Sequence, residues 1–255
     1  MILGAHVGRG KVLEEASKTR SEVIQIFMGP PRSWNAPVIK GDEGLIKDSG
    51  LLVYVHASYL VNPASLNKEV REQSRRYLEA YSKAAVMVGA RGLIVHGGHP
   101  TGSGTVDDGI AGWLEVMDGL ELPTRILIEN TAGGGSAVAR KFDSFKKLYT
   151  SLKNHNHDIG ICLDTCHAHA GGEELSKSVA TLRSFAGSID LVHANDSKDS
   201  FNSGRDRHEN LGSGMCGLEA VAQVVREAGC PAVVETPGGI EAMAVDIENL
   251  KKVGS

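Results

Sequence analysis

The chain has 255 residues, of which 41% are hydrophobic and 23% charged, and its formal net charge is −4. This composition provides enough apolar residues for a full core, and the negative charge argues against a protein that holds nucleic acid through bulk positive charge. No apolar stretch approaches the ~20 residues needed to span a bilayer. The first residues, MILGAHVG, lack the features of a signal peptide. We therefore expect a cytoplasmic protein without a membrane partner.

Eight short β-like runs alternate with helix-compatible segments along the chain. The runs are Ile2–His6, Val23–Phe27, Leu51–His56, Gly92–His96, Arg125–Glu129, Ile159–Asp164, Leu191–Asn195 and Pro231–Glu235. The helical segments are Lys11–Thr19, Glu69–Val88, Val106–Leu120, Phe142–Leu152, Glu173–Phe185, Leu218–Ala228 and Ile240–Lys252, with a short helix around Asp42–Asp48. Because βα alternation favours a parallel sheet, and eight units favour its closure, we predict an α/β fold: a single-domain (β/α)₈ TIM barrel over residues 1–255.

Most of the predicted strands end on a residue type that binds metals. These residues are His56, His96, Glu129, Asp164, His193 and Glu235. In a TIM barrel the carboxyl ends of the strands face one mouth, so residues far apart in sequence converge there. A lone histidine would be interpreted as a core or surface residue. Here six potential ligands follow the strand ends, which a random distribution of such residues would not do. The pattern predicts a metal-dependent active site at the C-terminal ends of the strands.

Two further stretches add candidate ligands. After the apolar run that ends at Leu163, we expect the strand to open into a loop that presents Asp164 and His167 to the pocket. The alternative is an ordinary strand end whose aspartate caps the next helix. The long polar segment 197–214 carries Asp206 and His208, which would point to the same side of an extended chain. These two side chains could bind one ion together with His167. The alternative is a solvated, flexible loop.

Five motifs together resemble those of the endonuclease IV family, the zinc-dependent apurinic/apyrimidinic endonucleases of DNA repair. The motifs, spread over nearly the whole chain, are LIENTAGGG (127–135), LDTCHAHAGG (163–172), HANDSK (193–198), RDRHENLG (205–212) and VVETP (233–237). The resemblance implies three Zn²⁺ ions per chain. It implies that Glu129 bridges the first two ions, that His56 and His96 complete the first, and that Asp164, His193 and Glu235 complete the second. His167, Asp206 and His208 would hold the third.

The resemblance also implies the reaction and the substrate. The implied activity is hydrolysis of the phosphodiester 5′ to an abasic site in double-stranded DNA, which leaves a 3′-OH and a 5′-deoxyribose phosphate; a 3′-repair diesterase activity is a further expectation. A wedge formed by Arg32, Tyr59 and Leu60 would help to flip out the abasic nucleotide. The sequence departs from the family where His96 is followed by GGHP, which leaves His99 as a less favoured substitute, and where Glu209 follows His208.

The residue types agree with this chemistry independently of the resemblance. Five histidines and four carboxylates favour zinc over magnesium, which prefers oxygen ligands. A carboxylate-bridged zinc pair can hold a hydroxide at neutral pH, and this bridging hydroxide would attack phosphorus with Glu129 and Glu235 as the catalytic carboxylates. Three divalent ions would also more than neutralise the ligand carboxylates, so that an acidic chain could attract phosphate.

Two other functions remain as alternatives. A sugar isomerase or epimerase of the xylose-isomerase-like barrels would share Glu129, Asp164, His193 and Glu235. It would not need a further five ligands together, namely His56, His96, His167, Asp206 and His208. A non-catalytic barrel that binds damaged DNA would not require the whole set of ligands. Because all the predicted ligands belong to one chain, we expect a monomer. His6, at the end of the first strand, is expected near the ligands without binding metal.

Overall fold

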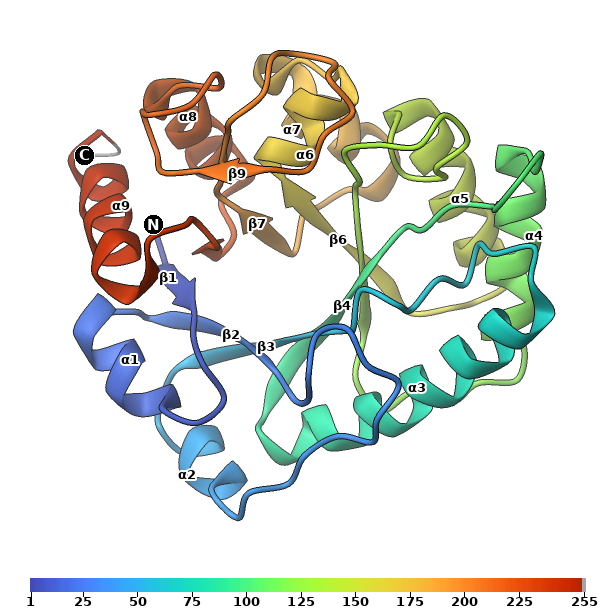
Figure 1. Ribbon diagram of the computed structural model, residues 1–255, viewed down its shortest axis with the longest axis horizontal. Helices are drawn as coiled ribbons and strands as arrows, with labels where there is room; N and C mark the ends of the chain where they lie inside the picture. Colours follow the sequence, from blue (N-terminus) through green and yellow to red (C-terminus); the bar gives the residue numbers. More distant parts are fainter. Residues whose placement is uncertain (254–255) are drawn as a thin grey trace.

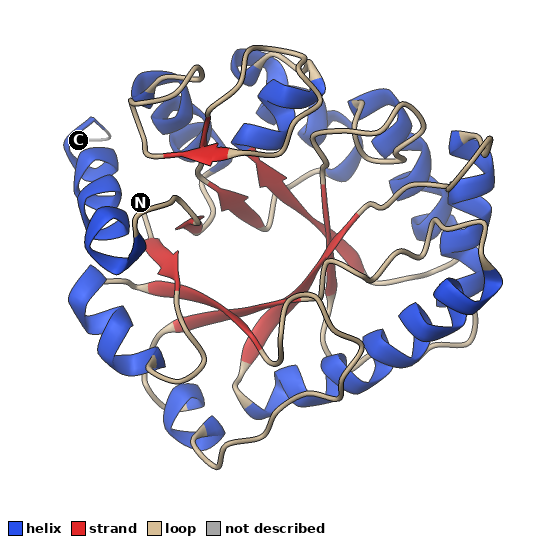
Figure 2. Ribbon diagram, in the orientation of Figure 1, coloured by secondary structure: helices blue, strands red, loops and turns tan. Residues whose placement is uncertain are grey.

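Eight parallel strands close into a barrel that is surrounded by helices (Figures 1 and 2). The computed structural model describes residues 1–253, so the last two residues of the predicted domain lie outside the described residues. Around the barrel the strand order is β1-β10-β7-β6-β5-β4-β3-β2. The strands are β1 Leu3–His6, β2 Val23–Phe27, β3 Leu52–His56, β4 Ala90–His96, β5 Ile126–Glu129, β6 Ile159–Asp164, β7 Leu191–His193 and β10 Ala232–Val234. The predicted TIM-barrel fold is confirmed.

The helices form the outer layer, and the first and last of them, α1 and α9, pack side by side where the barrel closes (Figure 1). They are α1 Val12–Thr19, α2 Glu43–Lys47, α3 Lys68–Met87, α4 Val106–Met117, α5 Phe142–Asn154, α6 Thr165–Gly171, α7 Leu175–Ala186, α8 Leu218–Ala228 and α9 Gly239–Val253. Helices α3, α5, α7, α8 and α9 follow the predicted segments closely. None of the described helices is both long enough and apolar enough to cross a membrane.

The prediction of a loop after Leu163 was wrong, because helix α6 begins directly at Thr165. Asp164 caps this helix: its Oδ1 atom accepts a hydrogen bond of 2.7 Å from the backbone N–H of His167. A side chain that caps the first turn holds the helix start at a fixed distance from the strand end. The capping alternative is therefore correct for Oδ1, while Oδ2 lies on the side of the other predicted ligands, 3.8 Å from Nδ1 of His193.

The barrel interior contains a small apolar cluster, separate from the main core between strands and helices. Its fully buried members are Val23, Tyr54, Ile94, Leu127, Cys162, Leu191 and Val233. In a strand, residues two apart point to the same face. Each member is therefore followed, two residues later, by a side chain that also points into the barrel, one layer nearer the mouth. For six of the seven strands that residue is a predicted metal ligand, so the apolar cluster forms the floor of the site.

The segment after β7 folds back over the mouth as a two-stranded antiparallel ribbon, β8 Asp196–Ser197 and β9 His208–Glu209. Buried Asp196 accepts hydrogen bonds from the backbone N–H groups of Gly212, Gly214 and Cys216. Asp246 of α9 accepts another from Leu211. These bonds fasten the C-terminal part of the segment to the barrel, while residues 205–207 are exposed to solvent, as the alternative of a solvated loop expects.

Candidate metal centre

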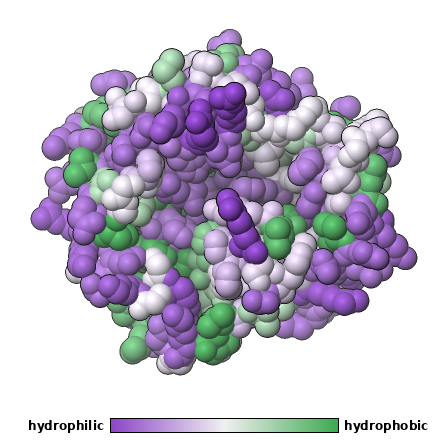
Figure 3. All heavy atoms as spheres, viewed as in Figure 1, coloured by the Kyte–Doolittle hydropathy of each residue, from purple (hydrophilic) through white to green (hydrophobic). Residues whose placement is uncertain are grey.

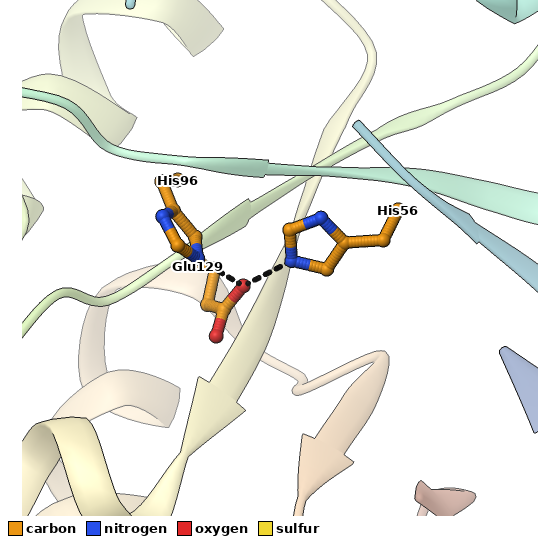
Figure 4. A group of neighbouring side chains, drawn as sticks. All are labelled: His56, His96 and Glu129. Carbon is orange, nitrogen blue, oxygen red and sulfur yellow. Dashed lines mark hydrogen bonds and ion pairs between the residues drawn. The ribbon is translucent and has the colours of Figure 1, made fainter. Parts of the chain in front are cut away.

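Glu129, at the end of β5, lies at the centre of the converging side chains and is only 1% exposed. Its Oε2 atom lies 3.1 Å from Nε2 of His56 and 3.2 Å from Nε2 of His96 (Figure 4). Its other oxygen, Oε1, lies 3.0 Å from Nδ1 of His193. The two oxygens of one carboxylate therefore face two different groups of side chains, as a residue that bridges two metal ions would require.

The second group of potential ligands contains Asp164, His193 and Glu235 with Glu129. Nδ1 of His193 lies 3.1 Å from Oε2 of Glu235 and 3.8 Å from Oδ2 of Asp164. One potential ligand atom from each of the four residues lies within 4.8 Å of the others. Strand β10 ends at Val234, so Glu235 is the first residue beyond it. The sequence placed this strand end one residue too late.

The third group consists of His167, Asp206 and His208. Nε2 of His167 lies 3.1 Å from Oδ1 of Asp206, and Nε2 of His208 lies 3.3 Å from the same oxygen. Both nitrogens are buried, yet neither makes a hydrogen bond within the described part of the chain. Buried polar atoms are almost always partnered in folded proteins. Two unpartnered imidazole nitrogens aimed at one carboxylate oxygen are the donor arrangement expected of a metal site.

In three of the five candidate histidines, the second ring nitrogen is held by the protein backbone. Nδ1 donates to a carbonyl oxygen in three of these histidines: His56 to Ala57 at 2.7 Å, His167 to Asn130 at 2.9 Å and His208 to Glu235 at 3.3 Å. A hydrogen bond of this kind fixes which nitrogen carries the proton and leaves the other as a ligand. In all three the free nitrogen is Nε2, the atom that faces the carboxylates.

Two buried asparagines position these ligands, and sequence reasoning missed both. The backbone N–H of Asp164 donates to Oδ1 of Asn130 at 2.8 Å. Nδ2 of Asn195 donates to Oδ2 of Asp164 at 2.7 Å, while its Oδ1 accepts from the N–H of Glu235 at 2.9 Å. Each asparagine stands one or two residues beyond a strand-end ligand, and that placement was the available signal.

The electrostatics of the centre favour ionised carboxylates. Burial opposes a charge on Glu129, but His193 and His96 hold the pKa of its carboxyl group well below the usual value. Burial likewise opposes the charge on Glu235, where His193 and His56 lower the pKa to about 2. For His208, burial disfavours the cation, yet Asp206 and Asp164 raise its pKa to about 9. The pocket thus stabilises positive charge among its carboxylates, which is the condition for binding a divalent cation.

The remaining cysteines and histidines are less suited to bind metal. Cys162 and Cys166 each lie near a group of ligands, but burial raises the pKa of each thiol to about 12, and the thiolate is the form that binds metal. His6, His99 and His169 belong to none of the candidate metal groups found among residues 1–253. His169 instead lies within hydrogen-bonding distance of the carbonyl oxygen of Asp199.

The three predicted wedge residues lie together beside the centre. The N–H of Tyr59 donates to the carbonyl oxygen of Pro31 at 2.8 Å, which brings the exposed Arg32 next to it. Tyr59 is 48% and Leu60 37% exposed, and the Tyr59 ring stacks on His96 with centroids 5.7 Å apart. Both residues line a cavity of about 460 Å³ that reaches His96, His167 and Asp206. Figure 3 shows this face hollowed near its centre, with hydrophilic side chains around the hollow.

Comparison with known proteins identifies the family. Residues 13–253 match the family model described as xylose isomerase-like TIM barrel. A probable endonuclease 4 from Mycobacterium leprae is 44% identical over 236 residues, which cover 92% of this chain and 93% of that protein. The chain belongs to the endonuclease IV family. Endonuclease IV from Thermus thermophilus has a similar structure, with a TM-score of 0.83 at 28% identity over 99% of this chain and 98% of that one.

The barrel itself does not distinguish endonucleases from sugar-converting enzymes. A D-tagatose 3-epimerase-like protein shares the fold with a TM-score of 0.79, at 19% identity over 99% of this chain and 97% of that one. Fold similarity of this kind carries no information about the reaction. The assignment to the endonuclease IV family therefore rests on the sequence similarity to probable endonuclease 4 and on the side chains at the barrel mouth.

Proposed function

We propose that this protein is a DNA-repair hydrolase that cleaves the phosphodiester 5′ to an abasic site, leaving a 3′-OH and a 5′-deoxyribose phosphate. The observation that carries the proposal is the third group of ligands, His167, Asp206 and His208. A one- or two-metal sugar isomerase would have no use for it, whereas a phosphodiester has several oxygens that need positive charge during hydrolysis. The same centre is expected to act as a 3′-repair diesterase on blocking groups that are joined to the 3′ end through a phosphodiester.

The donor set fits three zinc ions. It combines five imidazoles with four carboxylates. Because Nδ1 of His167 and of His208 is held by a carbonyl oxygen, Nε2 is the atom left to bind a metal, which would displace the proton there. Bound zinc would supply Lewis-acid activation of water and would neutralise charge on the phosphate. The protein's own part is to fix the ligands: Glu129 presents one oxygen to each of two groups, and Asn195 holds both Asp164 and Glu235.

Recognition of the substrate rests on side chains around the mouth. The exposed Tyr59 and Leu60, with Arg32 beside them, are the residues that we propose to fill the gap left in a duplex when an abasic nucleotide is flipped out. Arg205 and Arg207 are less available for phosphate, because both form ion pairs with Asp199. We propose double-stranded DNA with abasic sites as the partner and a monomer as the working form.

The direct test is incision of two matched duplexes, one with a single abasic site and one intact. We expect the protein to cut only the damaged strand, and mass spectrometry of the fragments to find a 3′-OH and a 5′-deoxyribose phosphate. Glu129→Gln should lower the rate at least ~100-fold because it removes charge from the bridging position. Asp143→Ala, on the exposed face of α5, is the control and should cut normally. Equal cutting of the two duplexes, or full activity of Glu129→Gln, would refute the proposal.

A further inference from the structure

The side chains of the layer at the barrel mouth include two that are not predicted ligands. Six of the eight strands contribute a ligand to this layer, whereas β1 contributes His6 and β2 contributes Gln25. Both strands are neighbours in the barrel, and the two residues pair in register. Gln25 is fully buried, although an amide at that depth must satisfy both its oxygen and its nitrogen. Its partners therefore reveal what it does there.

The amide of Gln25 contacts two predicted ligands of the second group. Its Oε1 atom lies 2.7 Å from Nε2 of His193, and its Nε2 atom donates to Oε1 of Glu235 at 2.5 Å. The remaining N–H of the amide faces Nδ1 of His6 at 3.0 Å. One side chain thus joins a histidine and a carboxylate that come from β7 and from the end of β10.

Only one orientation of this amide is compatible with its neighbours. If the oxygen and nitrogen were exchanged, the amide oxygen would lie against the Glu235 carboxylate, and two acceptors would repel each other. In the orientation observed, Oε1 of Gln25 can only accept a hydrogen bond, so Nε2 of His193 carries the proton and donates it. His193 therefore keeps Nδ1 as its ligand atom, the nitrogen that lies 3.0 Å from Glu129 and 3.1 Å from Glu235. His56, His167 and His208, whose Nδ1 atoms contact backbone carbonyls, present Nε2 instead. His193 therefore needs a different hydrogen-bond partner to fix its tautomer.

We propose that Gln25 is a positioning residue for the second metal group: it selects the tautomer of His193 that is protonated on Nε2, which leaves Nδ1 as the ligand atom, and it holds the Glu235 carboxylate in the orientation that faces His193. His6 assists by accepting the second amide N–H, which prevents the Gln25 side chain from rotating. The inference rests on the proposed function, since it assumes a zinc-dependent hydrolase. Removing a hydrogen-bond partner of a metal ligand typically lowers metal affinity or activity by about 10–100-fold.

Two substitutions separate the two contacts. Gln25→Met keeps the length of the side chain but removes both hydrogen bonds, so we expect zinc retention against a graded chelator to weaken about 10–100-fold, and kcat on an abasic duplex to fall by a similar factor. Gln25→Glu keeps an oxygen acceptor for His193 and places a second carboxylate against Glu235. This variant should retain zinc and still lose kcat, while KM stays unchanged in both because neither contact reaches DNA.

Tyr54→Phe is the matched control. Tyr54 pairs in register with Gln25 on the adjacent strand β3, lies in the apolar floor, and donates only to the carbonyl oxygen of Asp190 at 3.3 Å. Tyr54→Phe therefore removes a buried hydroxyl that contacts no predicted ligand. Circular dichroism of the metal-free proteins checks that each variant folds. If Gln25→Met does not fold, Gln25→Glu tests the positioning role.

The outcomes separate this inference from the proposed function. If the wild-type protein binds zinc and cuts the abasic duplex, but both Gln25 variants match Tyr54→Phe in zinc retention and kcat, Gln25 does not position the ligands. If both variants lose only thermal stability, its role is structural, and the inference is again wrong. If the wild-type protein neither binds zinc nor cuts the duplex, the proposed function fails first and the positioning role fails with it.

Discussion

Glu129 joins the first two ligand groups, and its burial explains why they must be considered together. A buried carboxylate without compensation is strongly unfavourable. Imidazole nitrogens of His56, His96, His167 and His193 lie within 3.2 Å of its two oxygens. No change at this residue can therefore affect one group alone, and Glu129→Gln is expected to weaken both.

At the wedge, we predict that recognition of damage can be separated from zinc binding. Tyr59→Ala combined with Leu60→Ala should weaken binding to an abasic duplex, because the wedge offsets the few kcal/mol lost for each unstacked base step. Zinc content should not change, since the bond from His56 to the Ala57 carbonyl and the packing of His96 against other ligand rings remain. Fluorescence anisotropy with labelled duplexes and elemental analysis would measure the two properties.

The comparison needs an intact duplex at the same salt concentration. Phosphate contacts alone would weaken binding to damaged and intact DNA together. A selective loss on the abasic duplex supports the wedge. Equal losses on both duplexes, or loss of zinc from the variant, would mean that Tyr59 and Leu60 only support the barrel mouth.

At the scale of the elements, the ribbon β8–β9 and the segment around it bring two of the three ligands to the third group. Asp246 of α9 accepts hydrogen bonds from Leu211, Asn210 and Thr236, and so ties this segment to the last helix. We predict that Asp246→Ala lowers zinc occupancy from three ions towards two, because His208 and Asp206 lose their fixed distance from His167. Elemental analysis after dialysis measures the occupancy, with Asp143→Ala as the control. Three zinc ions per chain in Asp246→Ala would show that the hydrogen bonds to Asp246 are not needed to hold the segment.

The sequence predicted the strands and the convergence of the ligands because both follow from one regularity. Inward-facing residues alternate along each strand, so an apolar residue in the floor and a ligand two positions later, such as Leu127 and Glu129, mark the barrel and its mouth together. The approach of Asp206 and His208 to His167 also agrees with the prediction. The assignment of these residues as zinc ligands, and of Arg32, Tyr59 and Leu60 as a wedge, stays a prediction.

What the sequence did not indicate depends on contacts between distant segments. Gln25, Asn130 and Asn195 are neutral amides. The position of Asn130 and Asn195 just beyond a strand-end ligand is their one local signal, and it does not show which side chain each amide contacts. Helix α6 was missed because TCHAHAG is short and its polar residues suggested a loop, whereas all seven of its residues are buried against neighbouring elements. Tertiary packing and the Asp164 cap outweighed the weak local preference.

At the scale of the whole molecule, a centre that gathers ligands from β3 to β10 should couple metal binding to stability. A ligand present at about 1,000 times its Kd stabilises the folded state by about 4 kcal/mol per site. For a chain of this size, that corresponds to a rise of roughly 8 °C or more in the thermal midpoint. We therefore predict that chelation lowers the midpoint by at least this amount in calorimetry and that added zinc restores it. An unchanged midpoint would mean that the converging side chains hold no tightly bound metal.

The central claim is that nine side chains of one chain form three zinc sites. Elemental analysis of protein purified without chelator tests it most directly, with the abasic-duplex assay run on the same sample. We predict close to three zinc ions per chain, with incision lost when they are removed and recovered when zinc is returned. A reproducible value of one ion or fewer, together with sugar isomerisation restored by Mn²⁺, would contradict the account and favour a sugar isomerase.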